Sequence, residues 1–332
     1  MFEFLRRRRV SPTEFSRNPG AARLLEHCLK RAEQDPSELV VVVPKLIPSF
    51  LDMADPTERG KLFVALVKHL RHGEDVERFV RALFKGVSAD KAVRYAAIGN
   101  RTKRLPCGDV QIAVRSVAEA RLAGVAHPIG ADVIDWLKGL GPDAVLYEIG
   151  AGIGIASLIA VGQPARPRAV AFEAAYFNFA ALCENIVVNK CVDRVTPIHA
   201  ALTDRTGIGE FFCRVVERGT GEHAFGRPVN RGGNPFEPEA VLMVPGLRLD
   251  DAVAMFRLPP PTHLLIHVDG AEGAVLRGAE SCLRGGAVQG MLIAPQAVPA
   301  QALEVDRLLE RSGWSETERA GTVGEMREFH RR

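Results

Sequence analysis

The sequence predicts an α/β protein with a doubly wound, mostly parallel sheet and an N-terminal all-helical unit. Two observations lead to this fold class. From residue 143 onward, short apolar runs alternate with amphipathic segments, which is the pattern of a parallel sheet with helices on both faces. Residues 20–86 instead carry apolar side chains at three-to-four spacing, as amphipathic helices do.

Four segments are predicted along the 332 residues, and the length itself favours about two domains. The segments are a basic mobile arm (1–19), the helical unit (20–86), a transitional segment (87–127) and the α/β domain (128–332). The arm contains the run Arg6 to Arg9 and two prolines, and arginine runs are usually solvated charge. The helical unit contains no motif that points to chemistry.

The charge distribution argues against nucleic acid as a partner. The chain has 43 Lys and Arg against 40 Asp and Glu, a formal net charge of +3. Residues 1–31 hold eight basic and three acidic side chains, so the rest of the chain is slightly acidic. A nucleic-acid-binding surface would need a basic patch on the body of the protein. The arm can give at most weak contact with a membrane surface.

The sequence favours a cytoplasmic protein. No apolar run approaches the roughly 18 to 20 residues of a membrane-spanning helix, and no apolar stretch follows Arg9 as it would in a secretory signal. The six cysteines have no spacing typical of a zinc site or a disulfide framework. No metal site is predicted, and the oligomeric state is left open.

The α/β domain contains the apolar run 144–149, which is typical of a buried parallel strand. Before it, alternation over 111–117 predicts a strand, and apolar spacing over 129–140 predicts a helix. After it, the same criteria predict strands at 169–173, 194–200, 241–244, 263–269 and 291–294, helices at 155–161, 176–189, 250–256, 274–283 and 300–312, a hairpin-like piece at 209–216 and a terminal hairpin near 314–318 and 328–330. Residues 217–240 are rich in Gly, Pro and Asn and predict a long loop, of the kind that often forms a lid or is disordered.

The turn after the first strand carries most of the functional signal. A strand ending in an acidic residue, a Gly-x-Gly-x-Gly turn and a helix bring backbone N–H groups and a helix N-terminus beside a ligand. A dinucleotide fingerprint would need glycine at position 155, which is Ile155. The spacing instead favours S-adenosylmethionine as the cofactor. The predicted cofactor-binding residues are Glu148, Gly150, Ala151, Gly152, Gly154 and Glu173.

Two acidic strand ends strengthen this prediction. Glu148 is placed to meet the ammonium group of the cofactor, directly or through water. Glu173 ends the next strand and is placed for the two ribose hydroxyls, because a carboxylate accepts hydrogen bonds from both. The competing interpretation is a tight strand–helix turn in which the glycines serve only close packing.

Four segments, in this order, resemble FkbM-type methyltransferases, a branch of the class I, Rossmann-like fold that uses S-adenosylmethionine. They are YEIGAGIG (147–154), AFEAAYFNFAALCENIVVNKCVDRVTPIHAALTDRTGIGEFF (171–212), VPGLRLDDAV (244–253) and LIHVDGAEGAVLRGAESCL (265–283). The resemblance covers roughly 128–318 and does not reach the helical unit. It implies a glycine loop at Gly150, Gly152 and Gly154 and a ribose-binding acid at Glu173. It also implies O-methylation of a hydroxyl on a sugar, glycolipid or polyketide-like metabolite.

The chain departs from the family in the segments expected to act on the methyl acceptor. The family's usual Lys-Ile-Asp-Val-Glu-Gly-Ala-Glu motif corresponds to residues 265–272, where Leu265, His267 and Asp269 replace Lys, Asp and the first Glu. The strand at 291–294 runs on into Pro295, where the family often has an acid and a histidine. The residues expected to bind the cofactor therefore match the family pattern better than those expected to act on the acceptor.

Asp269, His267 and Glu272 are the predicted catalytic residues. Methyl transfer needs the acceptor oxygen held close and aligned, and an alcohol acceptor benefits from a base that takes its proton. Asp269 or His267 is the predicted base, since period-two alternation places both on one side of a strand near its carboxyl end. Glu272 is predicted to help orient the acceptor. The alternatives are a buried structural His267, N-capping of the next helix by Asp269 or Glu272, and a metal held by all three.

Three functions follow from these observations. The first is methyl transfer from S-adenosylmethionine to a small-molecule hydroxyl. The second is a non-catalytic cofactor-binding protein whose helical unit engages a protein partner, which the altered motif at 265–272 favours. The third is a nicotinamide oxidoreductase, which Ile155 argues against.

Overall fold

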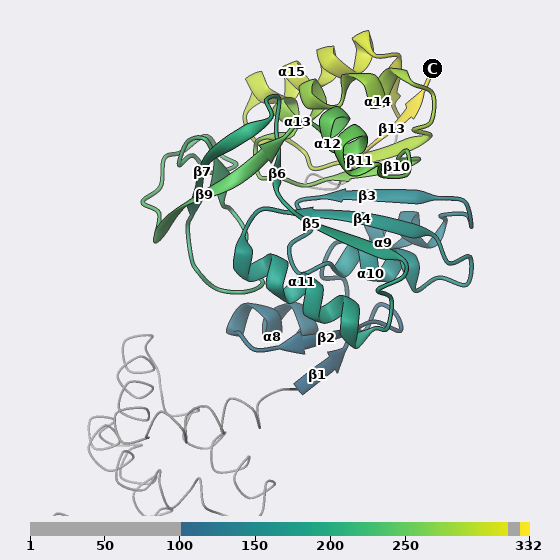
Figure 1. The fold of residues 1–332 in the computed structure, drawn as a ribbon, viewed down its shortest axis with the longest axis vertical. Helices are drawn as coiled ribbons and strands as arrows, with labels where there is room; N and C mark the ends of the chain where they lie inside the picture. Colours follow the sequence, from purple (N-terminus) through teal and green to yellow (C-terminus); the bar gives the residue numbers. More distant parts are fainter. Residues whose placement is uncertain (1–100, 318–325) are drawn as a thin grey trace, which may run out of the picture. The chain divides into compact units, whose positions relative to one another are not determined.

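The computed structural model describes residues 101–317 and 326–332 (Figure 1). The predicted basic arm (1–19), the predicted helical unit (20–86) and the first part of the transitional segment lie outside the described residues. Within the described ranges, no helix has the length and apolar character needed to cross a membrane.

A seven-stranded sheet forms the centre of the described chain, with the order β12-β13-β11-β10-β3-β4-β5. Its strands are β3 (Val145–Ile149), β4 (Arg168–Glu173), β5 (Val195–His199), β10 (His263–Ile266), β11 (Gly290–Ile293), β12 (Trp314–Glu316) and β13 (Arg327–Arg331). The pairings of β13 with β11 and β12 are antiparallel, and the other four pairings are parallel. The predicted doubly wound, mostly parallel sheet is confirmed.

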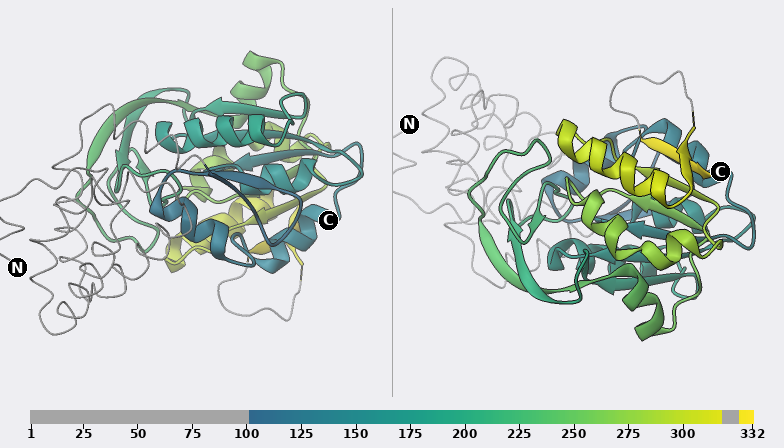
Figure 2. Two further views of the ribbon diagram at one scale, coloured as in Figure 1. Left: turned by 90° about the horizontal axis from the view of Figure 1, so that it is seen from below. Right: turned by 90° about the horizontal axis from the view of Figure 1, so that it is seen from above.

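Helices cover both faces of this sheet (Figure 2). One face carries α9 (Ala131–Lys138), α10 (Ile155–Val161) and α11 (Tyr176–Val188); the other carries α12 (Leu249–Phe256), α13 (Glu272–Gly278), α14 (Glu280–Arg284) and α15 (Pro299–Arg311). Along β3 the side chains alternate between the two cores: Leu146 packs with α9 to α11, and Tyr147 packs with the other layer. All five residues of β3 are buried, which is why the sequence shows it as an apolar run interrupted only by Glu148.

The described part of the transitional segment packs on the outer side of α11. It forms a hairpin of β1 (Arg101–Arg104) and β2 (Gln111–Val114), followed by α8 (Val117–Gly124). The predicted strand 111–117 is therefore too long, because a helix begins after Ser116. The Ser116 hydroxyl accepts from Glu119 N–H at 2.9 Å, and the Glu119 carboxylate accepts from Arg115 N–H at 2.7 Å. This reciprocal capping starts a helix where alternation alone suggests a strand.

A second, four-stranded sheet extends beyond the end of β5 (Figure 1). It contains β6 (Ala201–Leu202), β7 (Gly207–Cys213), β8 (Ala224–Phe225) and β9 (Ala240–Leu247), in the order β6-β9-β7-β8. The predicted hairpin-like piece at 209–216 and the predicted strand at 241–244 pair with each other as β7 and β9. The long loop 217–240 connects them and contains β8.

Two predictions near residue 270 need correction. The predicted strand 263–269 ends at Ile266, and the chain then turns, with Asp269 and Gly270 at positive φ angles of +53° and +108°. His267 and Asp269 therefore lie in the turn after β10 and do not share a strand face. The predicted helix 274–283 is two helices, α13 and α14, which are separated at Ala279.

Candidate active site

A cavity of about 280 Å³ lies at the carboxyl ends of the central strands. It is lined by the turn after β3, the ends of β4 and β5, residues of the second sheet, and the turn after β10. The chain runs from β3 to β4 and β5 on one side of the sheet, and from β10 to β11 on the other. The cavity is therefore at the topological switch point, where doubly wound sheets bind their ligands.

The glycine loop forms one wall of the cavity through Gly150 and Gly152. The N–H groups of Gly150 and Ala151 donate to the Phe172 carbonyl at 3.0 and 2.9 Å, which ties the loop to the end of β4. Gly150 has a φ angle of +82°, and a Cβ atom there would overlap the His267 carbonyl oxygen. The absence of a side chain at position 150 is therefore what lets the turns after β3 and β10 meet.

Three of the predicted cofactor-binding residues do not line the cavity. Ala151 is buried within the glycine loop, and Gly154 is the N-cap of α10. Glu148 is 6% exposed, and one of its carboxylate oxygens accepts from both the N–H (2.8 Å) and the hydroxyl of Ser157. Burial raises the pKa of Glu148 to about 7. In this structure Glu148 fixes the first turn of α10.

The burial of Glu148 predicts a pH-dependent stability. Its pKa is about 7 in the folded chain against an ordinary value of 4.5, so folding favours the protonated form. This contribution to stability is fully present below about pH 4.5 and is lost as the pH rises through about 7. The full shift corresponds to on the order of 3 kcal/mol. Between about pH 5 and about pH 8, thermal unfolding should show a larger loss of stability for the wild-type chain than for Glu148→Gln, whose amide does not ionise. If the stabilities of the two proteins changed equally with pH, this expectation would be contradicted.

Glu173 joins the glycine loop to the end of β4 and lines the cavity. Its carboxylate accepts from Gly152 N–H and from Ala175 N–H, each at 2.7 Å. Burial raises the pKa of Glu173 to about 7, although these two N–H groups oppose the shift. The carboxylate therefore lies in the cavity wall beside the glycine loop, as expected from the sequence.

The turn after β10 brings His267 and Asp269 into the cavity wall next to the glycine loop. The His267 side chain is 54% exposed and its Nε2 lies 3.9 Å from Asp269 Oδ1. The other oxygen, Asp269 Oδ2, accepts from Glu222 N–H at 2.7 Å. Asp269 holds its positive φ angle in the middle of this turn, a strained backbone conformation of the kind that clusters at functional sites.

Glu272, the third predicted catalytic residue, is not in the cavity wall. It is 1% exposed at the start of α13, and Oε1 accepts from Gly270 N–H at 3.3 Å. Among the described residues, no group donates a hydrogen bond to Oε2. Burial raises the pKa of Glu272. The N-cap of α13 is Ala271, so neither Asp269 nor Glu272 caps that helix through its side chain.

Part of the long loop lines the cavity, and the sequence did not indicate which of its residues do so. Thr220, Gly221, Glu222 and His223 line the cavity, and we call residues 217–223 the lid. The His223 ring packs edge-on against Phe177 with ring centroids 5.3 Å apart, and burial lowers the pKa of this histidine. The sequence signal that was available is the length of the loop together with a lone histidine inside it.

The cavity wall carries acidic groups and apolar surface. Its charged residues are Glu173, Glu222 and Asp269, and neither lysine nor arginine lines the cavity within the described chain. Phe211 and Phe225 supply aromatic surface on the side of the second sheet. Such a wall is electrostatically suited to a cationic or neutral ligand and unfavourable to a phosphate.

No metal centre is formed in the part of the chain that the structure describes. There, no group of three or more His, Cys, Asp or Glu side chains is arranged to hold a metal ion. The arrangement of His267, Asp269 and Glu272 thus does not support the alternative in which all three bind one metal, because Glu272 is turned into the interior.

Among known proteins, the chain is structurally similar to methyltransferases with which it shares little sequence identity. No family model and no curated protein matches the chain. Among solved structures, it is similar to the methyltransferase FkbM from Methylobacillus flagellatus (11% identity, 88% of this chain and 60% of that chain covered, TM-score 0.42). It is also similar to an O-methyltransferase from Bacillus cereus in complex with SAH (16% identity, 64% and 84% covered, TM-score 0.37). The chain spans only 60% of the length of the FkbM structure.

Proposed function

We propose that this chain is an S-adenosylmethionine-dependent methyltransferase of the FkbM type that methylates a hydroxyl of a sugar, glycolipid or polyketide-like metabolite. The observation that carries the proposal is the cavity itself. At the switch point of a doubly wound sheet, it combines a glycine loop, the carboxylate of Glu173 and the turn of His267 and Asp269. The resemblance of the sequence in the same segments supports it.

The charge of the cavity wall and the open space beside Gly152 support the proposed cofactor. S-adenosylmethionine supplies an electrophilic methyl group on a positively charged sulfonium, and the charged residues that line the cavity are acidic. A Cβ atom at Gly152 would meet no atom within 4 Å, so the backbone there faces open space. Glu173 would accept hydrogen bonds from the ribose hydroxyls in exchange for those from Gly152 and Ala175.

The residues after β10 would act on the acceptor. Asp269 keeps Oδ1 directed to His267 while Oδ2 is held by the lid. We propose that Asp269 takes the proton of the acceptor hydroxyl and that the exposed imidazole of His267 helps to orient the hydroxyl. In this role Asp269 makes the oxygen more nucleophilic as it approaches the methyl group. Glu272 would stabilise this turn by accepting a hydrogen bond from the Gly270 N–H group.

Labelled methyl transfer tests the proposed activity without requiring a purified acceptor. The full chain is incubated with extracts of small molecules and isotopically labelled S-adenosylmethionine, and the products are analysed by mass spectrometry. We expect a neutral, hydroxyl-bearing metabolite to gain one labelled methyl group, and Asp269→Asn to lose this product. Cofactor binding without any labelled product across a broad panel of extracts would overturn the catalytic proposal and favour a non-catalytic cofactor-binding protein.

A further inference from the structure

We infer that Arg218 is a positioning residue, which holds the lid over the cavity by pairing with a buried carboxylate of α8. The inference concerns the lid itself, and only its consequence for cofactor affinity rests on the proposed function. It assigns a role in the site to α8, a helix whose own residues do not line the cavity.

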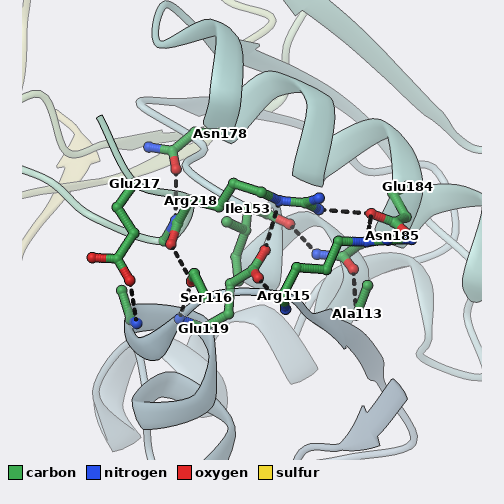
Figure 3. Close-up of polar contacts among 12 residues, drawn as sticks. Ala113, Arg115, Ser116, Glu119, Ile153, Asn178, Glu184, Asn185, Glu217 and Arg218 are labelled. Carbon is green, nitrogen blue, oxygen red and sulfur yellow. Dashed lines mark hydrogen bonds and ion pairs between the residues drawn. The ribbon is translucent and has the colours of Figure 1, made fainter. Parts of the chain in front are cut away.

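The centre of the arrangement is a cluster of ion pairs (Figure 3). Arg218 Nε lies 2.9 Å from Glu119 Oε1 of α8, and Arg218 Nη2 lies 2.7 Å from Glu184 Oε2 of α11. The Glu119 side chain is fully buried, whereas that of Arg218 is 21% exposed. A buried carboxylate needs a charged partner, and the lid supplies it. Arg115 pairs with Glu184 from the other side and completes the cluster.

The backbone of the lid is fixed around Arg218 by direct hydrogen bonds (Figure 3). The Ser116 hydroxyl donates to the Arg218 carbonyl at 2.6 Å. Asn178 of α11 accepts from Gly219 N–H at 2.8 Å and donates to the Thr220 carbonyl at 2.9 Å. Three consecutive lid residues are therefore tied to α8 and α11, and their backbone cannot move independently of these helices.

The fixed part of the lid leads directly to the part that contacts the site. Two residues after Thr220, the Glu222 N–H donates to Asp269 Oδ2, the proposed base. The next residue, His223, packs against Phe177 and lines the cavity. Arg218 thus helps to fix the segment that makes these two contacts, although Arg218 itself does not line the cavity.

The same outer layer also supports the glycine loop. Asn185 of α11 is buried and accepts from Ala113 N–H of β2 at 2.8 Å. Its Nδ2 donates to the Ile153 carbonyl in the glycine loop at 2.9 Å. Residues 113–119 therefore support the cavity at two places, on the lid through Arg218 and on the glycine loop through Asn185.

The test removes the pair without leaving a buried charge. Arg218→Ala alone would strand the Glu119 carboxylate and could unfold the protein, so the double variant Arg218→Ala/Glu119→Gln is compared with wild type. Arg121→Ala is the matched control, because it removes an exposed arginine of α8, the helix that contains Glu119. Hydrogen exchange of residues 217–223 is measured in the ligand-free full chain. The affinity and dissociation rate of S-adenosylmethionine are measured on the same proteins.

We expect the double variant to exchange its lid amides faster than wild type and to bind S-adenosylmethionine about tenfold more weakly. The loss should appear as faster dissociation with little change in association. Arg218→Lys, which keeps the charge, should recover part of the affinity, and Arg121→Ala should resemble wild type. A folded double variant with wild-type exchange of the lid would overturn the inference. If the wild-type chain binds no S-adenosylmethionine but the double variant still exchanges its lid amides faster, the result would support the role of Arg218 and contradict the proposed function.

Discussion

Gly152→Arg is expected to abolish cofactor binding while leaving the chain folded. Gly152 has a φ angle of +56°, a left-handed conformation that costs a non-glycine residue about 1 to 2 kcal/mol, which is less than the stability of a typical folded domain. Since a Cβ atom there would meet no atom within 4 Å and the residue lines the cavity, the arginine would extend into the open space. Its guanidinium would reach the Glu173 carboxylate and compete with the ribose. We expect calorimetry to show a loss of at least about a hundredfold in affinity, or close to 3 kcal/mol.

Gly313→Arg provides a matched control for this variant. Gly313 also has a positive φ angle, +83°, and a Cβ atom there would likewise meet no atom within 4 Å. It precedes β12 at the far edge of the sheet and does not line the cavity. The two variants should have similar thermal stabilities, but only Gly152→Arg should lose the cofactor. Equal affinities of the two variants would contradict the placement of the cofactor on the glycine loop.

Asp269→Asn should reduce turnover by about a hundredfold to ten-thousandfold with little change in cofactor affinity. A positioned general base contributes this much to the rate, and an amide cannot take the proton. Asparagine has nearly the shape of aspartate and tolerates the left-handed conformation at φ +53°. Its side-chain oxygen can still accept from Glu222 N–H, so the lid should stay in place. The loss should therefore appear in kcat, whereas KM for the cofactor stays near the wild-type value.

His267→Asn distinguishes between the two candidate bases that the sequence left open. The His267 side chain is 54% exposed, and its Nε2 lies 3.9 Å from Asp269 Oδ1. Removal of the imidazole should therefore lower the rate of methyl transfer less than removal of the Asp269 carboxylate. Single-turnover rates with labelled cofactor would measure both variants. A larger loss for His267→Asn than for Asp269→Asn would contradict the role proposed for Asp269 and assign the base to His267.

The central sheet could be predicted from the sequence because its signal is local. A strand buried on both faces is mostly apolar, and β3 is such a strand apart from Glu148. Helix α10, whose seven residues are all buried, has a similar apolar signal at 155–161, interrupted only by Ser157. The predicted positions of Gly150, Gly152 and Glu173 in one wall follow from the same logic, because the carboxyl ends of neighbouring parallel strands meet at one edge of the sheet.

The features that were not predicted depend on contacts between distant segments or on local backbone turns that the residue pattern does not show. Ser116 and Arg218 are 102 positions apart, and nothing in either segment alone indicates that they meet. The predicted strand 263–269 is too long because the period-two pattern of the sequence continues past Ile266, where the strand ends. Glu148 has the sequence position of a ligand-binding acid at the end of a strand, but its carboxylate is used by Ser157 within the first turn of α10.

Calorimetric titration of the full chain with S-adenosylmethionine tests the central claim most directly. The titration is carried out at about pH 8, where the carboxyl of Glu173, with a pKa of about 7, is mostly ionised. We predict saturable binding of one cofactor per chain, with no binding to Gly152→Arg and no competition from NADH. No heat of binding to the folded wild-type chain, or equal binding to Gly152→Arg, would contradict the assignment of this cavity to S-adenosylmethionine.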